Sequence, residues 1–190
     1  MNKFFLHISL LIILLPSCQE ININKELKEV STLDSILNHE QLYLDSLNLN
    51  KVRVYAQKAK YRTILFEDSN LSKFQKRWLE EDRQKYHQIH TNLNNLSLEF
   101  EALKQSYKYT KSQIRALKED LIYRHLKKEQ FMGYLKQEKI IQADLGKNSN
   151  QLLDLYHKNI RQLDSLEFKL QGILTQLDAI DRRHENATQE

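Results

Sequence analysis

Apolar side chains recur through residues 86–121 at alternating steps of three and four, the spacing of the buried seam of a long coiled-coil helix. Thr110 is the only small polar residue in this seam, and no Gly or Pro falls within the range. The pattern predicts one uninterrupted helix with one stripe buried against other helices. The seam consists of Tyr86, Ile89, Leu93, Leu96, Phe100, Leu103, Tyr107, Thr110, Ile114, Leu117 and Leu121.

Less regular seams predict one helix before this range, from about residue 25 to Phe66, and one after it, from about residue 149 to residue 180. Charged residues interrupt the first of these seams, so we expect that helix to pack most loosely. Its seam is Val30, Leu33, Leu37, Glu40, Leu44, Leu47, Lys51, Val54, Lys58, Tyr61 and Leu65. The seam of the last helix is Leu152, Tyr156, Asn159, Leu163, Leu166, Leu170, Ile173, Leu177 and Ile180.

Short polar segments mark the predicted turns. Residues 67–70 predict the first turn, and residues 145–149 predict the second, because Gly146 can adopt the left-handed conformation that ends many helices. The middle helix would then span residues 72–145. We allow a bend within residues 124–133, where the seam fails.

The predicted fold class is all-α, which agrees with a composition of only three Gly and one Pro. We expect an elongated antiparallel coiled coil of three long helices. The first helix would lie along the first half of the middle helix and the last along its second half, with both chain ends near the middle. The alternative is a compact four-helix bundle, in which the middle helix folds back near Arg124. A second apolar stripe is expected to bury against the overlap: Leu98, Ala102, Tyr109, Ala116 and Tyr123.

The first residues follow another pattern. Lys3 precedes an apolar run over residues 4–15, and Ser17 and Cys18 follow, Cys18 being the only cysteine of the chain. This arrangement resembles a bacterial lipoprotein signal peptide with its lipobox. The apolar run is shorter than the about 20 residues that span a bilayer. The resemblance implies that residues 1–17 are removed and that acyl chains on Cys18 hold the protein on a lipid bilayer.

This resemblance divides the rest of the chain into a lipidated tether (18–24), a single helical coiled-coil domain (25–184) and a frayed C-terminus (185–190). Gln19 takes the place of the aspartate that retains lipoproteins at the inner membrane, a feature similar to outer-membrane lipoproteins. We expect a lipid-anchored protein at the outer membrane, facing the periplasm, with display on the cell surface as the alternative. Three Asp-Ser-apolar triplets resemble O-glycosylation acceptors of exported Bacteroidota proteins and begin at Asp34, Asp45 and Asp164.

Few residues point to catalysis or metal binding. His87 and His90 lie three apart, and His157 follows Asp154 at a spacing found in metal sites. A di-iron helical bundle, however, needs two Glu-x-x-His pairs and two further glutamates. The chain has no Gly-rich phosphate loop, no nucleophile elbow and no H-E-x-x-H motif. We therefore expect no catalytic residue, metal, cofactor or small-molecule substrate, and a rod without a pocket of useful size.

Cations recur along one edge of the middle helix at steps of four, three, four and three. One interpretation is a surface for an anionic partner such as lipid headgroups, lipopolysaccharide or an acidic protein. The other, which we favour because the net charge is only +4, is pairing with acids of neighbouring helices. Nucleic acid is not an expected partner of an exported protein. The cations are Lys104, Lys108, Lys111, Arg115 and Lys118, and the acids are Asp154, Asp164, Glu167 and Asp178 or Glu26, Glu29 and Asp34.

The whole chain resembles small coiled-coil lipoproteins that are often labelled viral A-type inclusion proteins for their helical periodicity. This resemblance implies a non-enzymatic spacer or adaptor in the cell envelope. Its partners would be the bilayer, through acylated Cys18, and an unknown envelope protein or a second copy of the chain. The alternative is a holdase chaperone for unfolded outer-membrane proteins, similar to the Skp type, which the long helices and the basic edge fit. That family also has a small β-sheet body, for which we find no strand-like segment.

Overall fold

The computed structural model describes residues 23–68 and 73–187. Within these ranges lie four helices: α2 (Ile23–Asp45), α3 (Leu49–Asp68), α4 (Lys73–Ile122) and α5 (Lys128–Ala187). The predicted all-α class is confirmed. Cys18 lies outside the described residues, so its acylation stays a prediction.

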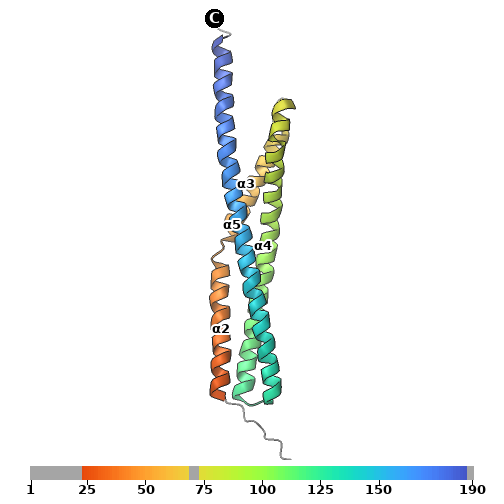
Figure 1. Cartoon of the computed structure of the whole chain (residues 1–190), viewed down its shortest axis with the longest axis vertical. Helices are drawn as coiled ribbons and strands as arrows, with labels where there is room; N and C mark the ends of the chain where they lie inside the picture. The colour runs from red at the N-terminus through yellow and green to blue at the C-terminus, as the bar shows by residue number, and fades with distance from the viewer. Residues whose placement is uncertain (1–22, 69–72, 188–190) are drawn as a thin grey trace, which may run out of the picture.

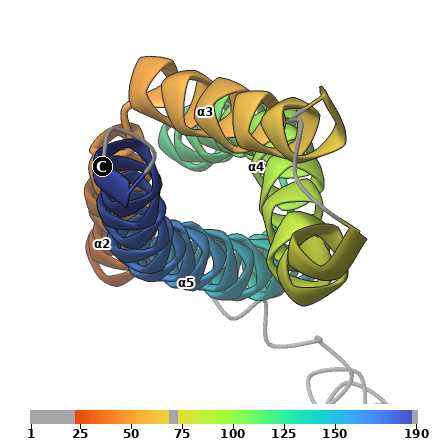
Figure 2. The same cartoon turned by 90° about the horizontal axis from the view of Figure 1, so that it is seen from above.

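The molecule is elongated (Figure 1). Helices α2 and α3 follow one another along the long axis, α4 runs back past both, and α5 returns in the direction of α2. Helix α2 packs against both α4 and α5, whereas α3 packs mainly on α4 and meets α5 only weakly. We call the part in which α2, α4 and α5 pack together the three-helix section. Beyond it α4 and α5 diverge, as the view along the axis also shows (Figure 2). At about 1.5 Å per residue the 50-residue α4 is about 75 Å long.

The seam predicted for residues 86–121 is confirmed. Ten of its eleven residues are buried, and Leu103 is partly buried against the same core. The last helix also buries most of its predicted seam as far as Leu170, including Asn159, which is 0% exposed, while Tyr156 and Ile173 are partly buried. The side chains of Leu177 and Ile180 lie outside the described part of the chain. A 3.6-residue period thus identified the helices that form the core.

The predicted first helix is two helices, because residues 46–48 interrupt it. Asn48 caps α3, since its Oδ1 accepts a hydrogen bond of 3.1 Å from the backbone N–H of Lys51. The interruption moves the buried face by one residue. Val54, a predicted seam residue, is 61% exposed, and Val52 and Ala59 are buried instead of the predicted Lys51 and Lys58. The seam predicted after Leu47 is therefore wrong.

The predicted middle helix ends at Ile122 instead of residue 145. Arg124 has a φ of 56°, and its N–H donates to the carbonyl of Leu121 at 3.4 Å while that of His125 donates to Asp120 at 2.9 Å. This pair of bonds is a Schellman motif with arginine where glycine is usual. The chain therefore reverses within the predicted bend, as the four-helix alternative required, although the molecule stays elongated.

Helix α5 begins with a strong start signal. The side chain of Gln130 accepts a hydrogen bond of 3.1 Å from the backbone N–H of Lys127, which is half of a capping box. Leu126 and Phe131 occupy the positions of a hydrophobic staple, and both pack into the core. The new helix then continues without a break through residues 145–149, so the turn predicted there is wrong.

The predicted arrangement and bounds of the helices need four further corrections. Helix α2 lies along the second half of α4, since Asp45 pairs with Lys104 at 3.2 Å, and α3 takes the first half. The two ends of the described chain, Ile23 and Ala187, lie at opposite ends of the molecule (Figure 1). Residues 185–187 are helical, not frayed, and α2 already begins at Ile23.

The second apolar stripe predicted on α4 is not buried. All five of its residues are exposed, with Leu98 at 72% and Tyr109 at 65%. The reason is that α2 and α5 both approach α4 from the side of its main seam. The stripe remains on the outer surface of the molecule.

Replacing Arg124 with glycine should stabilise the protein. A side chain at a left-handed φ costs about 1–2 kcal/mol, a cost that glycine does not have. We expect Arg124→Gly to raise the free energy of unfolding by about 1 kcal/mol, measured by urea denaturation followed by circular dichroism. The matched control is Arg115→Gly, which lies inside α4 and should lower the free energy of unfolding by about 1 kcal/mol. Equal destabilisation by both changes would contradict the assigned turn.

Candidate partner-binding surface

We define the basic edge as the five predicted cations of α4. Its residues lie on one side of the helix, next to the seam that packs against α2, and all are exposed except Lys111, which is half-buried. All of them except Lys118 line a groove of about 510 Å³, together with Gln41 of α2 and with Gln105 and Ser112 of α4. The basic edge consists of Lys104, Lys108, Lys111, Arg115 and Lys118.

Two members of the basic edge are held by α2. Lys104 forms an ion pair with Asp45 at 3.2 Å, and its Nζ also lies 5.8 Å from the ring centre of Phe100. Lys111 donates a hydrogen bond of 3.1 Å to Oε1 of Gln41. None of the predicted acids pairs with the basic edge among the described residues. The partners were misassigned because α2 lies along the other half of α4 than expected.

The other three members, Lys108, Arg115 and Lys118, have no ion-pair or hydrogen-bond partner within residues 23–68 and 73–187. The groove that the edge lines contains no carboxylate among its described lining residues. Unpaired cations beside one another repel, and an anionic partner would relieve that repulsion. The arrangement is therefore suited to an acidic ligand.

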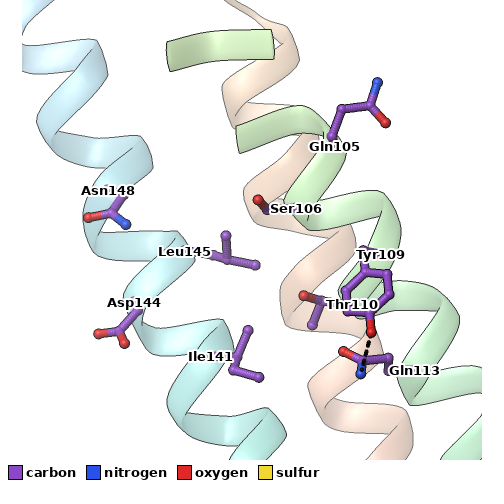
Figure 3. Close-up of a pocket in the computed structure, with 9 residues that line it drawn as sticks. All are labelled: Gln105, Ser106, Tyr109, Thr110, Gln113, Ile141, Asp144, Leu145 and Asn148. Atoms are coloured by element: carbon purple, nitrogen blue, oxygen red, sulfur yellow. Dashed lines mark hydrogen bonds between the residues drawn. The ribbon is translucent and has the colours of Figure 1, made fainter. Parts of the chain in front are cut away.

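A second groove lies between α4 and α5 (Figure 3). It holds about 480 Å³ and is open to solvent, with Ile141 and Leu145 of α5 directed toward α4. Tyr109 accepts a hydrogen bond of 3.3 Å from Gln113 at its edge. Both grooves are open to solvent, whereas small-ligand sites enclose most of their ligand, so the expectation of no useful pocket stays a prediction. Among the described residues lining this second groove, only Tyr109 and Asp144 are titratable.

Two of the histidines considered as metal ligands contact an amide and an aromatic side chain. His90 Nε2 is 2.9 Å from Asn94 Nδ2, and burial lowers the pKa of His90, as do the nearby charges of Lys60 and His87. His157 is exposed and packs edge-on against Tyr156, with ring centres 5.2 Å apart. Across the described residues, His, Cys, Asp and Glu side chains nowhere gather in threes that could hold a metal ion.

A buried polar cluster fixes α2 beside the basic edge. Oε1 of Glu40 accepts a hydrogen bond of 2.7 Å from Gln142, and Oε2 accepts one of 3.4 Å from the hydroxyl of Tyr107. That hydroxyl also lies 3.0 Å from Oγ of Ser149. A Cβ at Gly146 would lie 2.5 Å from Oε1 of Glu40. Gly146 therefore allows the carboxylate of α2 to approach α5 and does not end a helix.

Burial raises the pKa of Glu40, even though its hydrogen bonds from Gln142 and Tyr107 favour the charged form. Glu138, one turn before Gln142, is 7% exposed, and burial raises its pKa as well. Its Oε2 has no hydrogen-bond partner in the described structure. Sequence patterns identified Glu40 as an irregular seam residue but gave no signal for Glu138.

A second polar cluster joins α3, α4 and α5 further along the molecule. Arg62 donates two hydrogen bonds to Glu167, at 2.9 and 2.8 Å, and Lys58 lies 3.2 Å from the same carboxylate. Tyr86 donates a hydrogen bond of 3.0 Å to Oε1 of Glu167. Burial acts to raise the pKa of Glu167, but the hydrogen bonds from Arg62, Lys58 and Tyr86 outweigh it and the pKa is lowered.

Asn159 has the partner that a buried polar seam residue requires. Its Oδ1 accepts a hydrogen bond of 3.0 Å from Asn92 of α4, and its Nδ2 donates one of 2.7 Å to the carbonyl of Leu155. The pair fixes α5 against α4, since sliding one helix would leave both amides unpaired. Asn159, a polar residue in the predicted seam, therefore has a role in setting the register of α5 against α4.

The serines of the three Asp-Ser-apolar triplets are all exposed, and one of them lies in the interruption between α2 and α3. They are Ser35, Ser46 and Ser165, and the one in the interruption is Ser46. None of the helices in the described residues is both long and apolar enough to cross a membrane.

No family model, curated protein or solved structure matches the chain.

Substitutions of glycine in α5 test the contact between Glu40 and Gly146. Gly133→Ala adds its methyl group in open space and should raise the free energy of unfolding by about 1 kcal/mol through helix propensity. Gly146→Ala should give a gain smaller by about 1 kcal/mol, because Glu40 must move away from Gln142. In a Glu40→Ala background the two glycine substitutions should have equal effects. Thermal or urea denaturation measures all of these variants, and equal gains in the wild-type background would contradict the contact.

Removing the charge of Glu167 should destabilise the protein in a pH-dependent way. We expect Glu167→Gln to lower the free energy of unfolding by about 2–3 kcal/mol at neutral pH, because Arg62 and Lys58 lose their counter-charge. The folded pKa of Glu167 is below 4.5. The stabilisation is therefore present above pH 4.5 and is lost as pH falls through the folded pKa. Urea denaturation at several pH values should show the wild type approaching the variant in acid.

The control for that experiment is Glu81→Gln. Glu81 pairs with Lys85 on the exposed face of α4, and exposed pairs contribute little. Its substitution should leave the unfolding curve almost unchanged. An effect of Glu167→Gln that is equally small would mean that Glu167 does not tie α5 to α3.

Proposed function

We propose that the chain is a non-enzymatic, lipid-anchored spacer or adaptor of the bacterial cell envelope, and that the basic edge of α4 binds its protein partner. The observation that carries this proposal is the direction of the basic edge relative to the start of the helical domain. Ile23 comes a few residues after Cys18 and lies at one end of the long axis (Figure 1). A bilayer that holds Cys18 would face that end.

The basic edge runs along the axis, away from that end. Lys118 is the member nearest to it, and Lys104 lies about 21 Å further at about 1.5 Å per residue. With the long axis upright on the anchoring membrane, an edge with this direction points sideways instead of lying on the headgroups. This supports an acidic protein beside the molecule in preference to the lipids to which it would be attached.

The charges of the edge favour a partner that brings its own acids. Lys104 is already neutralised by Asp45, whereas Lys108, Arg115 and Lys118 are unpaired among the described residues. Their spacing of three to four residues follows one face of α4, which an acidic helix or extended segment can follow as well. We expect such binding to weaken with rising salt.

The test has two parts, in cells that express the full-length chain. Palmitate labelling and membrane fractionation should show acylation that a Cys18→Ala change abolishes. Photo-crosslinking from position 112, within the groove of the basic edge, should then recover one partner in stoichiometric amount from intact envelopes. Absence of acylation, or of any partner under several growth conditions, would reject the proposal.

A charge-reversed variant tests whether the edge itself binds. Lys108→Glu, Arg115→Glu and Lys118→Glu together should reduce crosslinking at least about tenfold, because each lost charge pair at an interface contributes about 1 kcal/mol or more. The matched control, Lys147→Glu, Lys158→Glu and Arg161→Glu, makes the same charge change at exposed positions of α5. Equal losses in both variants would contradict a specific role for the basic edge.

The second candidate function is a holdase for unfolded outer-membrane proteins. It is favoured by large apolar side chains that are exposed on the helices, among them Phe168 of α5 at 83% and Tyr61 of α3 at 59%. Such side chains can contact unfolded chains. An aggregation assay with an unfolded barrel protein separates the two functions: a holdase suppresses aggregation at equimolar amounts, and an adaptor does not.

A further inference from the structure

The end of the molecule at which α2 begins is also the end at which α4 and α5 are joined. Figure 1 shows the start of α2 beside the connection of residues 123–127. An ion pair of 2.7 Å between Glu29 of α2 and Lys139 of α5 holds the two helices side by side near this end. The start of α2 and the loop therefore present one common end surface.

This end surface combines exposed apolar side chains with cations. Ile122 is 48% exposed and Tyr123 is 68% exposed at the end of α4. The ring of Tyr123 stacks on His125, with ring centres 5.7 Å apart, which holds the ring at the tip. Arg124 and Lys127 belong to the same loop as Tyr123 and His125, and both are exposed.

The composition of the loop is unusual for a solvent-exposed turn. Residues 123–127 contain an arginine, a lysine, a histidine, a tyrosine and a leucine, with no Gly, Pro, Asn, Asp or Ser. Solvent-exposed turns use the latter residues. Leu126 packs against the core, whereas the side chains of Tyr123 and Arg124 are exposed.

Tyrosine rings and basic side chains have a shared preference for the boundary between a bilayer and water. The tyrosine ring lies at headgroup depth, and Arg and Lys extend to the phosphates while their stems contact apolar groups. Anionic lipids attract each such cation by about 1 kcal/mol near the surface. In the second turn of α5, Met132 and Tyr134 are also exposed, at 41% and 52%.

We propose that this end surface contacts the bilayer, with Ile122 and Tyr123 in the interfacial layer and Arg124 and Lys127 at lipid phosphates. The inference rests on the proposed function, because acylated Cys18 supplies the bilayer. At most about 3.5 Å of chain per residue separates Cys18 from the helical domain, so the acyl chains bring this end within reach of the headgroups. Two contacts, the acyl chains and the loop, then hold the long axis away from the membrane plane.

The experiment places an environment-sensitive fluorophore on single introduced cysteines of the full-length, cell-processed protein. Acylation blocks Cys18, the only native cysteine, so Tyr123→Cys or Tyr109→Cys supplies the only free thiol. Both positions are exposed and lie on α4 or directly after it, but residue 109 lies about 21 Å further from the end at about 1.5 Å per residue. Unchanged melting temperatures establish that both variants fold.

The labelled proteins are reconstituted in vesicles of phosphatidylethanolamine and phosphatidylglycerol. We expect emission from position 123 to shift to the blue and to be quenched by brominated lipids, whereas position 109 stays as in water. Adding Arg124→Glu and Lys127→Glu should reduce the quenching at position 123 about tenfold or more, since two attractions of about 1 kcal/mol become repulsions. Replacing phosphatidylglycerol by phosphatidylcholine should weaken the quenching in the same direction.

The outcomes separate the two proposals. Water-like emission from position 123 in acylated, vesicle-bound protein would overturn the contact of the loop with the bilayer and leave the anchored adaptor intact. A free thiol at Cys18 and protein that does not remain with vesicles would overturn the anchor, and the membrane contact with it. Equal quenching at positions 109 and 123 would show that the molecule lies flat, which also contradicts the proposed contact.

Discussion

The structure depends on one constraint: α4 must bury an apolar stripe along most of its length, and no single helix covers it. Helices α2 and α3 share one side of the stripe, and α5 covers the other along the section where α4 and α5 remain together. Apolar packing alone would tolerate sliding of such long helices, because each turn resembles the next. The polar contacts of Glu40, Glu167 and Asn159 occur at single positions and therefore define one arrangement.

Those polar contacts have different energetic characters. The carboxylate of Glu167 has three donors, and its lowered pKa indicates that they exceed the cost of burial. Glu40 has two weaker contacts and a raised pKa, and Glu138 has a raised pKa with one unpaired oxygen. The three-helix section thus contains charges that cost free energy as well as apolar contacts that stabilise it. Specific alignment is achieved there at some expense of stability.

The sequence predicted the buried faces of the helices correctly where the apolar period was continuous. It predicted the wrong face where a single residue shifted that period. The seam of α4 was readable because eleven positions agree with one period. The interruption at residues 46–48 moves the buried face by a single position. A heptad pattern applied across the whole of the predicted first helix does not show such a small shift. The reversal after Ile122 is predicted only by the four-helix alternative and not by the favoured rod, because Arg124 occupies the left-handed position where glycine is the usual signal. Conversely, Gly146 was read as a turn, although its small size serves the close approach of Glu40.

The basic edge could be listed by residue from the sequence, since its spacing follows one face of a helix. Its partners could not, because they depend on which half of α4 lies beside α2. Asp45 and Gln41 are unremarkable in the sequence and gain their roles only from that placement. The loop of residues 123–127 was likewise hidden inside a helix that was predicted to continue.

The opposite placement of Ile23 and Ala187 has a mechanical consequence (Figure 1). Tension applied between these two points would draw α5 lengthwise past α2 and α4 rather than peel one helix from its neighbours. Under such shear, the apolar layers and the carboxylate contacts along the shared length resist together, so the load is distributed instead of being concentrated on one turn at a time. The same helices joined with both ends on one side would separate under a much smaller force.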